Sequence, residues 1–189
     1  MRGEVPRPGV KTMKFRILGA MAAACVALAL PAHADKSAGN VVDDNTINAS
    51  VKMKLVEAKE VPSTQVNVET YKGVVLLSGF VETPAQKDAA GAAAKGVDGV
   101  KKVHNSVALH PKTSMGTKLD DTTITAKVKA ALMDDADVKS GQINVETRGG
   151  IVQLAGFVKG EGMQKRALEI AKGVKGVTKV EDAMYVKPE

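Results

Sequence analysis

Histidines and aspartates are the side chains of this chain whose chemistry could serve catalysis or metal binding. Neither His104 nor His110 has a cysteine or a carboxylate at the spacing of a zinc ligand set. Asp134, Asp135 and Asp137 lack the glycine and the terminal glutamate of a calcium loop. The sequence also contains no nucleophile elbow, phosphate loop or Ser/His/Asp set. We therefore expect no catalytic activity, no metal site and no cofactor.

Lysines beside aliphatic residues form a more specific signal, which would suit contact with an anionic lipid. They lie on the first predicted helix of each half, opposite its core stripe. The members are Lys52, Met53 and Val56 in the first half, and Lys129, Ala130 and Met133 in the second. Lysine supplies charge, and methionine supplies a flexible apolar contact. The competing interpretation is an ordinary exposed helix face, or a patch that is buried against the other half.

A basic cluster on the last predicted helix is a further candidate for lipid contact. Its members are Lys165, Arg166 and Lys172. Each basic residue near an anionic membrane surface contributes about 1 kcal/mol. The competing interpretation is again a solvated helix face.

These candidates occur in two sets because the chain is one unit used twice. Residues 43–111 align without a gap with residues 120–188 at a constant offset of 77, and 31 of the 69 aligned positions are identical. Self-similarity of this length predicts two tandem domains, at 43–110 and 119–189, joined by a linker at 111–118. The chain has no Trp and few other aromatic residues, so it offers no platform for stacking nucleic-acid bases.

The apolar period within each unit predicts the order helix, strand, strand, helix, strand. Apolar residues spaced by four follow Asp43-Asp44 and Asp120-Asp121, acidic pairs that favour a helix start. The period then changes to two, and the face of the second strand that carries Val75 and Val152 is expected to be covered by helices. Each unit should thus be an α+β fold, a three-stranded sheet with two helices on one face.

Several residues are expected to hold this fold together. Thr83-Pro84-Ala85-Gln86 predicts a capped helix start, which the second unit lacks. Gly79 and Gly156 are expected to let a helix approach the sheet closely. Asn105 and Asp182 fall on the inward phase of the last strand, where a polar side chain should bond a neighbouring loop. Two further structural glycines are Gly99 and Gly176.

Residues 1–34 have the features of an export signal. Lys14 and Arg16 precede the apolar run 17–30, and Ala32-His33-Ala34 suits cleavage after Ala34. The run is too short to span a bilayer. The sequence therefore predicts secretion to the periplasm, with residues 35–42 as an N-terminal extension.

Two alternatives remain open in this segment, translation from Met13 and lipidation of Cys25. Removal of residues 1–34 leaves 22 basic and 20 acidic residues, so the net charge falls from +6 to +2. The basic character of the whole chain therefore gives little support for a nucleic-acid partner.

The segments that occur twice resemble the BON domain. The resemblance is carried by the αββαβ order, by the strand that ends in Ser78-Gly79-Phe80-Val81, and by the segment from Gly96-Val97 to Val103-x-Asn105. Two tandem copies behind an export signal resemble periplasmic proteins of the OsmY type. One departure is Asp182, which stands where Asn105 fits the family pattern.

The resemblance implies a non-enzymatic envelope protein of the osmotic-stress type that binds phospholipid membrane surfaces. The alternative is a holdase-type chaperone of the periplasm. The expected partner is thus an anionic phospholipid surface or an unfolded periplasmic protein. A nucleic acid or a small-molecule substrate is not expected.

Overall fold

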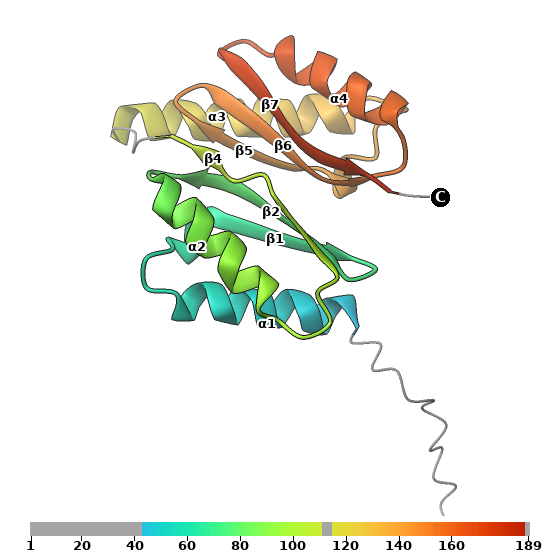
Figure 1. Cartoon of the computed structure of the whole chain (residues 1–189). Helices are drawn as coiled ribbons and strands as arrows, with labels where there is room; N and C mark the ends of the chain where they lie inside the picture. Colours follow the sequence, from blue (N-terminus) through green and yellow to red (C-terminus); the bar gives the residue numbers. More distant parts are fainter. Residues whose placement is uncertain (1–42, 111–114, 188–189) are drawn as a thin grey trace, which may run out of the picture. The chain divides into compact units, whose positions relative to one another are not determined.

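The computed structural model describes residues 43–110 and 115–187 (Figure 1). The predicted signal, the cleavage site, Met13 and Cys25 lie outside these residues. The elements of the first repeat are α1 (Asp44–Glu57), η1 (Ser63–Gln65), β1 (Val66–Tyr71), β2 (Val74–Val81), α2 (Pro84–Lys95), β3 (Lys102–Asn105) and β4 (Ala108–Leu109). Those of the second are α3 (Met115–Met133), η2 (Ser140–Gln142), β5 (Asn144–Arg148), β6 (Ile151–Val158), α4 (Glu161–Lys172) and β7 (Lys179–Val186).

Each repeat forms its own sheet, and the predicted α+β fold is confirmed. Strand β2 is central, antiparallel to β1 and parallel to β3 and β4. Strand β6 has the same place between β5 and β7. In each repeat the two helices cover one face of the sheet (Figure 1).

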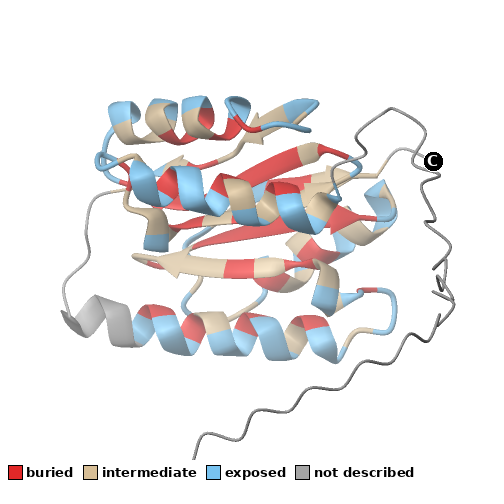
Figure 2. Ribbon diagram, turned by 90° about the horizontal axis from the view of Figure 1, so that it is seen from below, coloured by how far each residue is buried: buried red, intermediate tan, exposed pale blue. Residues whose placement is uncertain are grey.

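The helix-covered face of each sheet forms a core of aliphatic residues. Ile47, Val51 and Leu55 of α1 are buried, as the spacing of four predicts. Val75 and Val152 are fully buried on this face, which confirms the predicted orientation of the second strand. Figure 2 shows buried positions recurring along the helices and filling these central strands.

The helix start at Thr83 is also confirmed. The Thr83 hydroxyl accepts from the Gln86 backbone N–H at 3.2 Å, and the Gln86 side chain accepts from the Thr83 N–H at 3.2 Å. The equivalent helix α4 begins after Gly160 without a side-chain cap. Local sequence thus determines how firmly the first turn of each helix is held.

The predicted helix start at Asp120-Asp121 is wrong, because α3 already begins at Met115. Residues 115–118, assigned to the linker, are therefore helical, while 111–114 lie outside the described residues. Asp121 instead holds the β5–β6 hairpin, since its carboxylate accepts from the backbone N–H groups of Gly149 at 2.8 Å and Gly150 at 2.9 Å.

Asp44 makes the same latch in the first repeat. Its carboxylate accepts from the N–H groups of Lys72 at 2.6 Å and Gly73 at 2.7 Å. Asp44 also lies in the first turn of α1, where negative charge is favoured. The repeated aspartate therefore joins the first helix of each unit to its hairpin turn.

Gly79 and Gly156 do allow a close approach to the strand, but the predicted partner, a covering helix, is wrong. Both residues have positive φ, 108° and 139°, and a Cβ at either position would meet a backbone carbonyl oxygen, that of Gln65 or Gln142. The close approach is thus between the strand and the short 3-10 turn before the hairpin, and no helix is involved. Gly99 and Gly176 also have positive φ, 86° and 103°.

Asn105 bonds neighbouring backbone, but the predicted partner, a loop, is only half right, because Lys87 belongs to helix α2. The Asn105 amide donates to the Lys87 carbonyl at 2.7 Å and its oxygen accepts from the Val107 N–H at 3.4 Å. Asp182 is exposed, so its predicted inward position is wrong. Because a carboxylate cannot donate, it accepts from the Gln164 amide at 2.8 Å. It also accepts from the Met184 N–H at 2.9 Å, as Asn105 does from the Val107 N–H.

Candidate functional site between the repeats

The second face of each central strand is buried as well. In β2, Leu76, Ser78 and Phe80 are 2%, 2% and 4% exposed. The equivalent residues of β6 are Gln153, Ala155 and Phe157, at 1%, 2% and 6%. Helices cover only the other face, so these side chains are covered by the contacts between the repeats.

Aromatic and cationic side chains make these contacts in a reciprocal pattern. The Tyr71 ring lies 5.6 Å from the Phe157 ring, and the Arg148 guanidinium lies 5.6 Å from the Phe80 ring centroid. Arg148 is the equivalent of Tyr71, and Phe157 is the equivalent of Phe80, at the offset of 77. The repeats therefore pair about a pseudo-two-fold axis, as two subunits do across an isologous interface.

Gln153 is a buried polar bridge in this interface. Its side-chain oxygen accepts from the Gly79 N–H at 2.6 Å, and its amide donates to the Ser106 carbonyl at 2.9 Å. Both partners belong to the first repeat. The equivalent of Gln153 is Leu76, so only the second repeat supplies this bridge.

Arg148 adds a second set of bonds between the repeats. Its guanidinium donates to the His110 carbonyl at 3.2 Å and to the Gln65 side chain at 2.6 Å. Burial lowers the pKa of Arg148. An arginine can satisfy several acceptors at once, so it ties the two repeats together at several points.

A groove of about 600 Å³ lies between the first helices and first strands of the two repeats. We call it the inter-repeat groove. Its lining residues are Lys52, Val66, Asn67, Val68, Glu69, Lys129, Leu132, Met133, Ser140, Gly141, Gln142, Ile143, Asn144 and Val145. Several of them are equivalent pairs, above all Lys52 with Lys129 and Asn67 with Asn144. Its size falls in the range of small-molecule sites.

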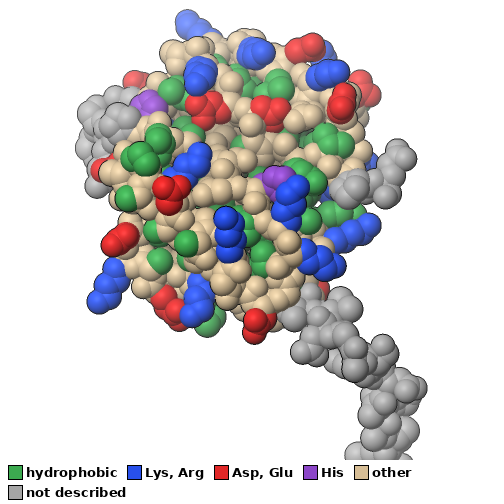
Figure 3. All heavy atoms as spheres, in the orientation of Figure 1, with side chains coloured by type: hydrophobic (Ala, Val, Ile, Leu, Met, Phe, Trp, Pro, Cys, Tyr) green, Lys and Arg blue, Asp and Glu red, His purple; other side chains and the backbone are tan. Residues whose placement is uncertain are grey.

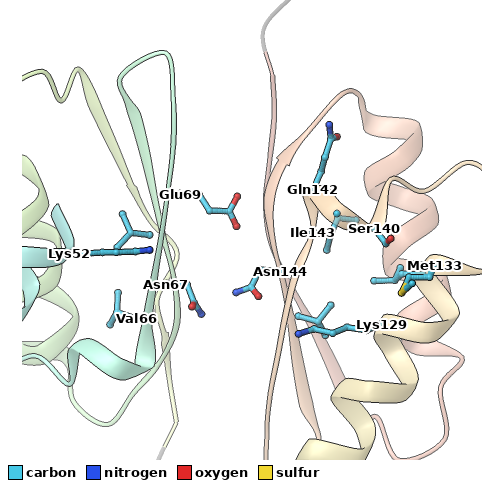
Figure 4. Close-up of a pocket in the computed structure, with 14 residues that line it drawn as sticks. Lys52, Val66, Asn67, Glu69, Lys129, Met133, Ser140, Gln142, Ile143 and Asn144 are labelled. Carbon is cyan, nitrogen blue, oxygen red and sulfur yellow. The ribbon is translucent and has the colours of Figure 1, made fainter. Parts of the chain in front are cut away.

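Side chains of opposite charge share this groove. Figure 4 shows Lys52 on one wall and Lys129 on the other, with the Glu69 carboxylate directed into the space between the walls. Burial raises the pKa of Glu69, while the Phe157 backbone hydrogen bond and the charge of Lys187 oppose this effect. Asn67, which lines the groove, donates to the Glu146 carboxylate at 3.3 Å and so links β1 to β5.

The structure brings together three of the residues selected from the sequence, namely Lys52, Lys129 and Met133. Met53, Val56 and Ala130 are exposed but do not line the groove. The interpretation that these patches are buried against the other repeat is therefore wrong.

The basic residues of α4 lie apart from this site. Arg166 pairs with Asp135 at 2.8 Å and with Glu169 at 3.7 Å, and Lys165 lies 3.6 Å from Glu161. The Asp135 hydrogen bond raises the pKa of Arg166, and the same bond lowers the pKa of Asp135. Lys172, which is exposed, does not line the groove. On the face drawn in Figure 3 basic and acidic side chains are interspersed.

His104 and His110 both pack against aromatic rings. The His104 ring lies 4.4 Å from the Tyr185 ring, and burial lowers the pKa of His104, followed by the charge of Lys102. The His110 ring packs edge to face against Phe80 at 6.2 Å. Within residues 43–110 and 115–187, no three His, Cys, Asp or Glu side chains are grouped so as to hold a metal ion.

Sequence reasoning missed the inter-repeat groove and the Gln153 bridge. The available signal was the face of the second strand that the helices do not cover. A solvent-exposed face should carry polar residues, but this one carries Leu76 and Phe80. In the part of the chain that the structure describes, none of the helices is both long and apolar enough to cross a membrane.

Comparison with known proteins places the chain in a family. It is 40% identical over 151 residues to "Osmotically-inducible protein Y" of Escherichia coli (strain K12), covering 79% of this chain and 75% of that protein. It is 34% identical over 146 residues to "Outer membrane lipoprotein DolP" of Haemophilus influenzae, covering 77% and 75%.

A solved structure of CdsD, described as a structural protein of the Type III secretion system of Chlamydia trachomatis, gives a TM-score of 0.34 at 15% identity. That match covers 80% of this chain and 66% of CdsD, and its TM-score is too low to establish a common fold. The model of the BON domain matches residues 43–111 and again 120–188. The chain therefore belongs to the BON-domain family and contains two BON domains in tandem.

Proposed function

We propose that this protein is a non-enzymatic, osmotic-stress type protein of the bacterial envelope, secreted to the periplasm, which binds the surface of anionic phospholipid membranes. The names of its relatives support the setting, since one is osmotically inducible and another is an outer-membrane lipoprotein. Both match this chain over three quarters of their own length.

The exposed apolar side chains are the observation that supports membrane contact. In the described part of the chain the large hydrophobic residues that are exposed are Met53 at 63%, Val56 at 69%, Leu109 at 50% and Met133 at 71%. All but Leu109 lie on the first helices of the repeats, and Val56 and Met133 are equivalent positions. Lys52 and Lys129 lie beside them. We call Lys52, Met53, Val56, Lys129, Ala130 and Met133 the first-helix patch.

This composition suits a lipid surface on physical grounds. Transfer of an apolar side chain from water to the acyl boundary is favourable, by on the order of 1 kcal/mol for a partly inserted residue. Each nearby lysine adds about 1 kcal/mol at an anionic surface. The acidic partners of Lys165 and Arg166 offset such a gain at α4.

Vesicle flotation tests the proposal. The chain should float with vesicles that contain an anionic phospholipid, less with purely zwitterionic ones, and less as salt is added. Replacement of Met53, Val56 and Met133 by Ser should weaken the affinity for the vesicles by roughly 100-fold, because about 1 kcal/mol is lost at each position. The matched control is Leu109→Ser, an exposed apolar residue outside the first-helix patch.

The alternative function, a holdase-type chaperone, would use the same apolar side chains. It predicts suppressed aggregation of a denatured client protein, and salt should not weaken that effect. If no vesicle composition retains the chain and aggregation is suppressed, the membrane proposal is wrong.

A further inference from the structure

The inter-repeat groove is lined by two lysines, Lys52 and Lys129, and by one acidic side chain, Glu69. Lys52 and Lys129 occupy equivalent positions on α1 and α3, and both line the groove, one on each wall (Figure 4). Among the described residues, the ion pairs do not include either lysine. Two ammonium groups that face one cavity favour an anionic ligand.

The same groove contains acceptors that suit a hydrogen-bond donor. The side-chain oxygen of Gln142 is buried and has no donor within the described residues. Gln142 and Glu69 line the groove and also a neighbouring cavity of about 280 Å³. A buried acceptor without a donor costs about 1–3 kcal/mol, so a ligand that donates to it is favoured.

We propose that the inter-repeat groove binds one glycerophosphodiester head group, with the phosphate on Lys52 and Lys129. Hydroxyl or ammonium groups of the same ligand donate to the Gln142 oxygen and to the Glu69 carboxylate. This inference rests on the proposed function, because it names the part of the lipid that would be recognised beside the first-helix patch.

The arrangement favours a head group over simpler anions. The groove of about 600 Å³ is larger than a phosphate ion needs, so phosphate alone would leave most of it to water. Met133 lines the groove and is 71% exposed, which supplies an apolar edge for the glycerol and acyl part of a lipid.

Amide chemical shifts of the ¹⁵N-labelled chain test this site. Titration with soluble, deacylated sn-glycero-3-phosphoglycerol should shift the amides of residues 66–69 and 142–145. Inorganic phosphate should bind roughly tenfold more weakly, since it fills only a small part of the groove and lacks the glycerol group. The double variant Lys52→Gln/Lys129→Gln should weaken head-group binding by roughly tenfold or more.

The matched control is Lys172→Gln/Lys175→Gln, which removes the same charge at lysines that do not line the groove. It should leave the affinity unchanged. The site is refuted if phosphate binds as tightly as the head group, if the control variant weakens binding equally, or if these amides do not shift.

Vesicle flotation distinguishes the two sources of this ligand. Retention on vesicles without amide shifts at the groove would overturn the head-group site and leave the proposed function standing. Shifts at the groove without retention on any vesicle would support the site for a free glycerophosphodiester and refute membrane binding. Competition of the soluble head group with vesicle binding would support both.

Discussion

Burial of the Glu69 carboxyl links the stability of the fold to pH. Because its pKa is raised above 4.5 in the folded state, the native state retains a proton that the unfolded state has lost. Stability should therefore fall as pH rises from 4.5 through the raised pKa, and it is largest below this window. Lys187 opposes the effect, and Lys52 and Lys129 face the same groove.

Glu69→Gln should remove this pH dependence. Relative to the natural chain, the variant should be more stable at about pH 7 than at about pH 4, because only the natural chain must ionise a buried group. Urea unfolding at the two pH values measures the difference. Glu60→Gln, at an exposed position, serves as the control. An equal effect of Glu69→Gln at both pH values would contradict the assignment.

The Gln65 backbone leaves no room for a side chain at Gly79. The Gly79 φ of 108° and the nearby Gln65 carbonyl oxygen make alanine unfavourable on two grounds. Gly79→Ala should destabilise the fold by about 3 kcal/mol or more in chemical unfolding. Gly162→Ala, inside α4 with open space around it, should instead stabilise by about 1 kcal/mol. Similar effects at both positions would argue against the backbone conflict.

At the scale of elements, strands β2 and β6 are held together by a polar bridge. Gln153→Leu introduces the residue found at the equivalent position 76, but it leaves the Gly79 N–H and the Ser106 carbonyl without their partner. We expect a loss of about 2–4 kcal/mol in the free energy of unfolding, because each buried unpaired group costs about 1–3 kcal/mol.

Gln164→Leu, at a half-buried position that loses a bond to Asp182, is the matched control for this substitution. It should change the free energy of unfolding by less than about 0.5 kcal/mol. A neutral Gln153→Leu variant would show that the apolar contact replaces the bridge.

For the whole molecule, the buried outer faces predict that the repeats stabilise one another. A chain reduced to residues 43–110 would expose Leu76 and Phe80, which are 2% and 4% exposed when both repeats are present. We expect the isolated first repeat to unfold at a lower temperature and to bind a hydrophobic dye. Thermal unfolding of 43–110, of 115–187 and of the full chain measures this coupling. Equal midpoints for all of them would contradict it.

Much of each repeat could be predicted from its sequence, because the responsible interactions are local. The spacing of Ile47, Val51 and Leu55 determines the buried side of α1, and Thr83 with Gln86 determines the start of α2. Asp120-Asp121 misled the prediction because an acidic pair suits a helix start and a hairpin latch equally well, and only the folded chain distinguishes them.

The candidate site could be predicted only in its parts. Lys52, Lys129 and Met133 stand out on helical faces, but periodicity places a residue on one side of its own helix and says nothing about the second repeat. Alternation along a strand likewise defines two faces without naming what covers each.

The amino-acid sequence by itself determined the duplication, the α+β units and their helix-covered cores, since these depend on contacts within about 70 residues. Tertiary structure alone decided that the outer sheet faces pair through Gln153 and Arg148, and that equivalent lysines share one groove. The physical reason is that this pairing depends on shape and hydrogen-bond complementarity between surfaces 77 residues apart, which no local pattern records.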